Sequence, residues 1–189
     1  NDLLDVEARV LTAVLDHSST AQGLYSQSVD RLIPTTGLAG SHLFSGSTRG
    51  PSLASELARE ILSADRIDWL VSFVRQSGVK PLLASLQEAT QRGTPFRLLT
   101  TTYMAVSDFQ AINRIARLPN TEVRISYNEN ATRLHAKAYL FYRNTGSHTV
   151  YVGSSNLSSV AMDTGLEWNV KASMAEVPQL VQSCFAEFD

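Results

Sequence analysis

Residues 135–142 read His-Ala-Lys-Ala-Tyr-Leu-Phe-Tyr, and residues 149–156 read Thr-Val-Tyr-Val-Gly-Ser-Ser-Asn. Both stretches contain a short run of apolar, aromatic and β-branched residues, which favours a strand in each. The segment between them carries Asn-Thr-Gly at 144–146, residue types that form tight turns. We therefore expect a hairpin that brings His135 and Asn156 to the same end of a sheet.

The residues at that end have the chemistry of a phosphodiester-cleaving site. Side chains alternate along extended backbone, so His135 and Lys137 are expected to project from the same face. Cleavage requires a nucleophile, donors for the phosphate oxygens and an acid for the leaving oxygen. Imidazole can serve as nucleophile or acid, Lys137 offers an ammonium and Asn156 an amide donor. Ser154 adds a hydroxyl, and Glu167 a carboxylate able to orient the imidazole, so this set requires no metal or other cofactor.

These residues resemble the signature of the phospholipase D superfamily, which is His-x-Lys, four residues, Asp, and then Gly-Ser-x-Asn after a turn. The match covers His135, Lys137, Gly153, Ser154 and Asn156. The resemblance implies a histidine nucleophile that forms a covalent phosphohistidine, with Glu167 in the place of a supporting acid. Tyr142 stands where the family has its aspartate, a residue more structural than chemical, and the gap to the glycine is longer than in the compact signature.

Further stretches narrow the resemblance. They are residues 99–103, 118–123, 133–141, 153–158 and 165–170. They are similar to the phospholipase D-like nuclease domain at the N-terminus of some bacterial DEAD/DEAH-type helicases, and the likeness runs from about residue 44 to 170. The resemblance implies a cytoplasmic domain of a larger DNA-processing protein, with DNA and the C-terminal helicase domains as its partners.

The chain has a single copy of the motif, because no second His-x-Lys occurs. Catalysis in the family uses two copies, one histidine as nucleophile and the other as acid for the leaving group. A two-fold axis beside the motif would place His135 of both subunits at one site, since an isologous interface repeats each residue across the axis. We therefore expect a homodimer with a shared site.

Three further residues are weaker candidates for contact with substrate: Arg133, Tyr103 and Ser155. Arg133 extends the basic group of the motif, and Tyr103 follows a threonine run at a strand end. A loop or helix-cap role is the stronger interpretation for Ser155, as it is for Ser158, whereas Ser154 is balanced between structure and oxyanion support. Other residues are expected to be structural: Trp69 and Trp168 in the core, Cys184 buried in the last helix, and His17, His42 and His148 at the surface or in loops.

The composition limits the classes of protein to which this chain can belong. The 189 residues are 43% hydrophobic, which suits a single domain with a sizeable core. The 16 basic and 18 acidic residues give a net charge of −2, so affinity for nucleic acid must be local and dependent on salt. No apolar run is long enough to span a membrane. The start lacks a Met and the pattern of a signal peptide, so we expect a fragment of a longer protein. The one cysteine excludes an internal disulfide and a cysteine-based zinc site.

Strands alternate with helices first, and a hairpin follows. We expect helices over 3–17, 52–64, 79–91, 108–117 and 177–188, and strands over 67–74, 96–102, 122–127, 136–142, 149–152 and 166–171. A loop or arm is expected over 18–52. This order predicts an α/β sandwich with a mixed sheet and helices on both faces, with an arm at 1–43 and one compact domain at 44–189.

Two other functions compete with a nuclease that acts on DNA. The first is a nucleic-acid-binding module of a helicase that retains the fold and the phosphate pocket without turnover. The second is a lipid phosphodiesterase, which the superfamily also contains. The sequence shows no obvious amphipathic face for binding a membrane, which argues against the lipid activity.

Overall fold

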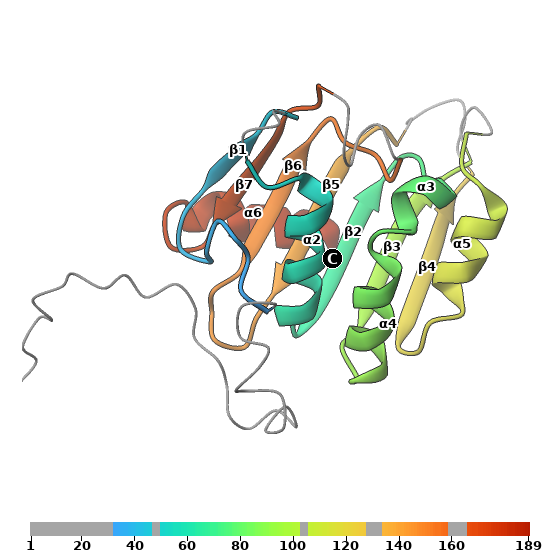
Figure 1. The fold of residues 1–189 in the computed structure, drawn as a ribbon, viewed down its shortest axis with the longest axis horizontal. Coiled ribbons are helices and arrows are strands. Elements are labelled where there is room, and N and C mark those ends of the chain that lie inside the picture. Colours follow the sequence, from blue (N-terminus) through green and yellow to red (C-terminus); the bar gives the residue numbers. More distant parts are fainter. Residues whose placement is uncertain (1–31, 47–49, 103–105, 128–133, 159–165) are drawn as a thin grey trace, which may run out of the picture.

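A computed structural model describes residues 32–46, 50–102, 106–127, 134–158 and 166–189. Its centre is one sheet of seven strands in the order β1-β7-β6-β5-β2-β3-β4 (Figure 1). The strands are β1 (His42–Phe44), β2 (Arg66–Val71), β3 (Phe96–Thr101), β4 (Thr121–Ser126), β5 (Lys137–Tyr142), β6 (Thr149–Gly153) and β7 (Asn169–Ser173). β2, β3 and β4 run parallel, whereas the pairs β2-β5, β5-β6, β6-β7 and β1-β7 are antiparallel. The predicted mixed sheet is confirmed.

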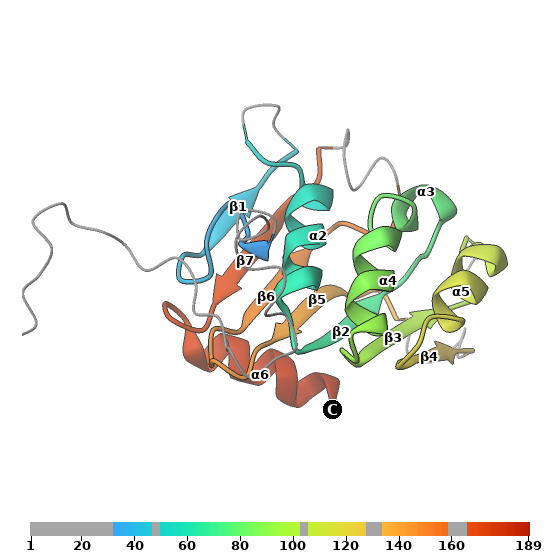
Figure 2. The ribbon, with the colours of Figure 1, turned by 60° about the horizontal axis from the view of Figure 1, so that its bottom comes forward.

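Helices cover both faces of this sheet, as predicted (Figures 1 and 2). One face carries α2 (Leu53–Ser63), α3 (Gln76–Val79), α4 (Leu83–Gln91) and α5 (Phe109–Ala116), and the other carries α6 (Pro178–Phe188). The start of α2 follows from its sequence, because the Ser52 hydroxyl accepts a hydrogen bond from the Ser55 N–H at 3.2 Å.

The larger core lies between the sheet and α2, α4 and α5. Trp69 at its centre is fully buried, as predicted, and meets Phe96 and Tyr139 edge to face at centroid distances of 4.9 and 5.3 Å. A smaller cluster of Leu140, Val150, Ala172 and Val181 lies under α6. The two clusters fix the strands that carry the motif.

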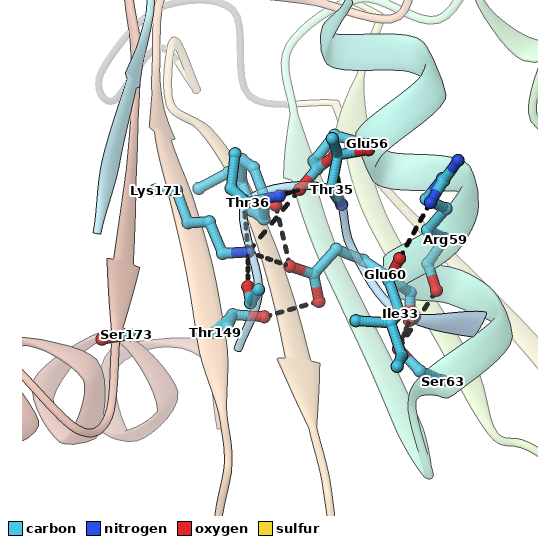
Figure 3. Close-up of polar contacts among 12 residues, drawn as sticks. Ile33, Thr35, Thr36, Glu56, Arg59, Glu60, Ser63, Thr149, Lys171 and Ser173 are labelled. Atoms are coloured by element: carbon cyan, nitrogen blue, oxygen red, sulfur yellow. Dashed lines mark hydrogen bonds and ion pairs between the residues drawn. The ribbon is translucent and has the colours of Figure 1, made fainter. Parts of the chain in front are cut away.

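A cluster of buried charges joins α2 to the sheet (Figure 3). It consists of Glu56, Glu60, Arg143 and Lys171, all buried, and we call it the buried ion cluster. Lys171 Nζ lies 2.9 Å from Glu60 and 3.8 Å from Glu56, and the Arg143 guanidinium binds Glu60 directly. Burial raises the pKa of Glu60, but the charges and hydrogen bonds of Arg143 and Lys171 outweigh it and hold that pKa below its usual value.

The same cluster fixes the segment before β1. Glu56 accepts hydrogen bonds from the backbone N–H groups of Thr35 and Thr36 at 3.0 and 2.9 Å, and Lys171 Nζ donates to the Thr36 hydroxyl at 2.8 Å (Figure 3). The prediction of a loop over 18–52 is wrong for residues 42–44, because they pair with β7 and form β1. The helix expected over 3–17 lies outside the described residues.

Three other element boundaries differ from the predictions. The helix expected over 79–91 begins only at Leu83, as α4. The short helix α3 ends at Val79, and Pro81, which lacks an N–H, lies between the two. β2 ends at Val71 because the next residues turn toward the loop after β6. β7 spans Asn169–Ser173 instead of 166–171. It begins at Asn169 because this residue pairs with Gly153, the last residue of β6.

Candidate active site

His135 and Lys137 lie together at the start of β5. The His135 ring is exposed, while Lys137 is only 6% exposed. Lys137 Nζ lies 3.0 Å from His135 Nδ1, 3.2 Å from Nε2 and 2.7 Å from the His135 carbonyl oxygen. The predicted common face is therefore observed, and the Lys137 Nζ lies against the His135 imidazole.

Phe73 brings Asn156 to this pair. Its backbone N–H donates to Asn156 Oδ1 at 3.0 Å, and its ring meets the His135 ring edge to face at 6.5 Å. With Oδ1 occupied, the amide orientation is fixed, and Nδ2 has no acceptor among the described residues. Asn156 thus presents an N–H donor of the kind predicted for a phosphate oxygen.

The close approach of β7 explains the glycine of the motif. A Cβ at Gly153 would lie 2.2 Å from the Trp168 carbonyl oxygen and 2.6 Å from Asn169 Cα. No side chain fits there, so the chain must have glycine to enter the loop that carries Ser154 and Asn156. Ser154 is exposed, and its hydroxyl accepts a hydrogen bond from the Trp168 N–H at 3.1 Å.

Ser155 is held inside the loop by its own bonds, which agrees with the loop role that was the stronger of its two interpretations. It is fully buried, its hydroxyl accepts from Asn169 Nδ2 at 2.7 Å, and its carbonyl oxygen accepts from the Tyr139 hydroxyl at 2.8 Å. These bonds fix the backbone between Ser154 and Asn156.

Glu167 acts on the site through its charge. Burial lowers the pKa of Lys137, and the Glu167 carboxylate partly offsets this by raising it. Burial also raises the pKa of Tyr139, and Glu167 adds to that rise. The predicted hydrogen bond from the His135 ring to Glu167 is not among the contacts of the described residues. Glu167 therefore favours the charged form of Lys137, and its role in orienting the His135 ring stays a prediction.

The sequence did not predict three buried polar residues whose hydrogen bonds hold the backbone around the site. Ser72 and Thr100 are fully buried; Ser72 donates to the Ala136 carbonyl oxygen at 3.3 Å, and Thr100 to the Ser72 carbonyl oxygen at 3.3 Å. Asn169, bonded to Ser155, is the third. Ser72 directly follows β2, Thr100 lies near the end of β3 and Asn169 begins β7, so a polar side chain next to a strand end was their one signal.

The remaining predicted residues lie elsewhere. Tyr142 is at the far end of β5, where it stacks on His148 with ring centroids 4.3 Å apart. Tyr142 lies five positions along the strand from Lys137, which places the two about 16 Å apart. Trp168 is 65% exposed, so its assignment to the core was wrong. Arg133 and Tyr103 lie outside the described residues.

The described residues contain neither a metal-binding cluster nor a membrane-spanning helix. Within them, no group of three His, Cys, Asp or Glu side chains is arranged to hold a metal ion. None of the helices in the described part of the chain is long and apolar enough to cross a membrane.

The motif lies in a region of the chain that matches a known family. A family model described as cardiolipin synthase, PLD-like domain, matches residues 57–188, which include the whole motif. The chain belongs to the PLD-like domain family. A search of curated protein sequences finds no significant match to this PLD-like domain.

Solved structures share the fold of this PLD-like domain. NucT from Helicobacter pylori aligns with a TM-score of 0.58 and 17% identity, over 79% of this chain and 94% of that one. Nuc from Salmonella typhimurium, a phospholipase D family member, gives 0.53 and 19%, over 79% and 92%. Polyphosphate kinase from Porphyromonas gingivalis gives 0.52 and 13%, over 79% of this chain but 26% of its own length. At these identities the likeness concerns the fold.

Proposed function

We propose that this PLD-like domain is a metal-independent phosphodiesterase that acts on DNA, with His135 as its nucleophile. The observation that carries the proposal is the convergence on one sheet end of an exposed imidazole, a buried lysine within 3.2 Å of it and an oriented amide donor. Each group has a role in attack on phosphorus, and Ser154 adds an exposed hydroxyl beside them.

In the first step, a ring nitrogen of His135 attacks phosphorus and the bond from phosphorus to the leaving oxygen breaks. The leaving oxygen takes a proton from the second histidine of the site, and the product is a phosphohistidine. Water then attacks this phosphorus, gives its proton to the second histidine and releases His135. Lys137 and Asn156 bind the non-bridging oxygens, and Glu167 supports the charge of Lys137.

The second histidine comes from a second copy of the chain. A row of exposed apolar side chains across three neighbouring strands supports this assembly. Val170 on β7 pairs with Val152 on β6 and with Leu43 on β1, and the three residues are 45 to 49% exposed. They lie on the α6 face, beyond the part that α6 covers, and Trp168 extends the row at 65% exposure. Exposed apolar patches of this kind mark protein interfaces, and Val152 directly precedes the motif glycine.

The assembly has its own test in sedimentation. We expect Val152→Glu to be monomeric and inactive, while Phe109→Glu, which alters an exposed apolar residue of α5 on the opposite face, stays dimeric. A wild-type chain that is monomeric at the concentrations where it cleaves would contradict the shared site. From the sequence resemblance we also propose that the domain works in the bacterial cytoplasm, beside the C-terminal helicase domains of its own polypeptide.

The activity is tested with labelled single- and double-stranded DNA in excess EDTA at pH 5 to 8, with His135→Ala as the comparison. Cleavage by the wild type that the variant lacks supports the proposal. If the wild type binds DNA but leaves it intact, the domain is a binding module. Hydrolysis of a phosphatidyl substrate with no action on DNA would replace the nuclease by a lipid phosphodiesterase.

A further inference from the structure

A groove of about 370 Å³ lies away from the motif, between α3, α4 and α5. Its walls carry four uncharged amide side chains and two guanidinium groups, with one leucine. The arginines are Arg114 in the last turn of α5 and Arg117 at its end. Both are exposed, so the groove is open to solvent.

The charge of this groove is unbalanced. No carboxylate lines it, and within the described residues neither Arg114 nor Arg117 forms an ion pair. The polar contacts inside it are long: Arg114 reaches Gln76 Oε1 at 3.5 Å, and Gln76 Nε2 reaches Gln110 Oε1 at 3.5 Å. The helix dipole explains why an arginine stands at the C-terminal end of α5. It does not explain why side-chain amides with only long hydrogen bonds surround both arginines.

The groove is joined to the candidate active site through the backbone. Arg75 N–H donates at 2.8 Å to the carbonyl oxygen of Leu157, the residue after Asn156. Gln76, the next residue, begins α3 and lines the groove. The Arg75 side chain is exposed and has no ion pair within the described part of the chain. Arg75 before α3 and the two arginines of α5 are thus cations without an ion pair in the described part of the chain.

We propose that this groove is a subsite for a nucleotide of a single polynucleotide strand, next to the one whose phosphate lies at His135. Guanidinium groups bind phosphate oxygens, and side-chain amides offer both donors and acceptors to base edges. The volume is within the range of small-ligand pockets. The inference rests on the proposed function and gives it a substrate class: an extended strand engages the groove, whereas a small diester reaches only the motif.

The test compares Arg114→Gln, Arg117→Gln and their double variant with the wild type. The control is Arg124→Gln, which removes the same charge from an exposed surface pair on β4. Binding of a labelled single-stranded oligonucleotide is measured by anisotropy in EDTA as salt is varied. Cleavage of the same strand and of bis(p-nitrophenyl) phosphate is measured in parallel, and urea unfolding checks the fold.

Each phosphate contact to a single strand contributes about 0.7 to the slope of log affinity against log salt. We expect the double variant to lose about 1.4 of this slope and to bind roughly 10- to 100-fold more weakly at about 50 mM salt. Cleavage of the small diester should be unchanged, as should all properties of Arg124→Gln. Unchanged binding and slope in the double variant would overturn the proposal, as would an equal loss on both substrates. Oligonucleotide binding tests the groove even if the wild type cleaves no substrate. A failure of the subsite can therefore be distinguished from a failure of the proposed activity.

Discussion

Substitution of Glu60 by Gln should be among the most damaging single changes in this protein. The fully buried carboxylate accepts from four groups: Thr149 Oγ1 at 2.8 Å, the Tyr151 hydroxyl at 2.8 Å, Lys171 Nζ at 2.9 Å and the Arg143 guanidinium. Gln has the same shape but replaces one acceptor oxygen by a donor. At least one cation would then stay buried without a counter-charge.

Breaking a buried pair by removing one partner costs about 3–5 kcal/mol, a large share of the roughly 5–15 kcal/mol that stabilises a domain. With a urea m-value of about 2 kcal/mol/M, the midpoint should fall by about 1.5–2.5 M at unchanged m. The control is Glu122→Gln, the same change in an exposed pair with Arg124. Such pairs contribute about 0–1 kcal/mol, so the control midpoint should hardly move.

The pH dependence provides a second check. Because the pKa of Glu60 is lowered in the folded state, its contribution is complete above the usual carboxyl value of 4.5 and is lost as pH falls through the folded pKa. The stability difference between wild type and Glu60→Gln should therefore shrink below about pH 4.5. A variant that loses no more than Glu122→Gln at neutral pH would refute the reasoning.

Three further predictions concern the motif. Gly153→Ala should destabilise the protein by about 1–3 kcal/mol and lower cleavage, because its Cβ meets the backbone of β7, whereas Gly50→Ala, with no atom within 4 Å, should be neutral in urea unfolding. Asn156→Asp keeps the acceptor for the backbone amide but loses the donor for phosphate, so we expect wild-type unfolding with loss of cleavage; cleavage at the wild-type rate would contradict the role. Glu167→Gln should move the alkaline limb of kcat/KM to lower pH, because it removes the charge that raises the pKa of Lys137. An unmoved limb would exclude Lys137 as its source.

The motif was accessible to sequence reasoning because its signals are local. Alternation along one strand placed His135 with Lys137, and a turn of recognisable composition placed Asn156 at the same end. β1 was missed because it has only three residues and forms by pairing with β7, far along the chain. A segment rich in Ser, Thr and Gly gives no local sign of such pairing.

Buried charge was equally inaccessible from sequence. Glu60 belongs to a helix whose pattern is amphipathic, and its partner Arg143 lies 83 residues later. Only the fold shows that the two meet. Trp168 illustrates the reverse error, because a large aromatic residue is usually buried, whereas this one extends an exposed apolar row.

The most direct test of the central claim is to trap the covalent intermediate. The wild type would be mixed with a labelled DNA strand in excess EDTA and quenched within a single turnover, under alkaline conditions that preserve phosphohistidine, and its peptides analysed by mass spectrometry. The account predicts a nucleotide adduct on His135 that forms and decays at rates compatible with turnover and is absent from His135→Ala. Cleavage that proceeds with no adduct, or with an adduct on another residue, would contradict it.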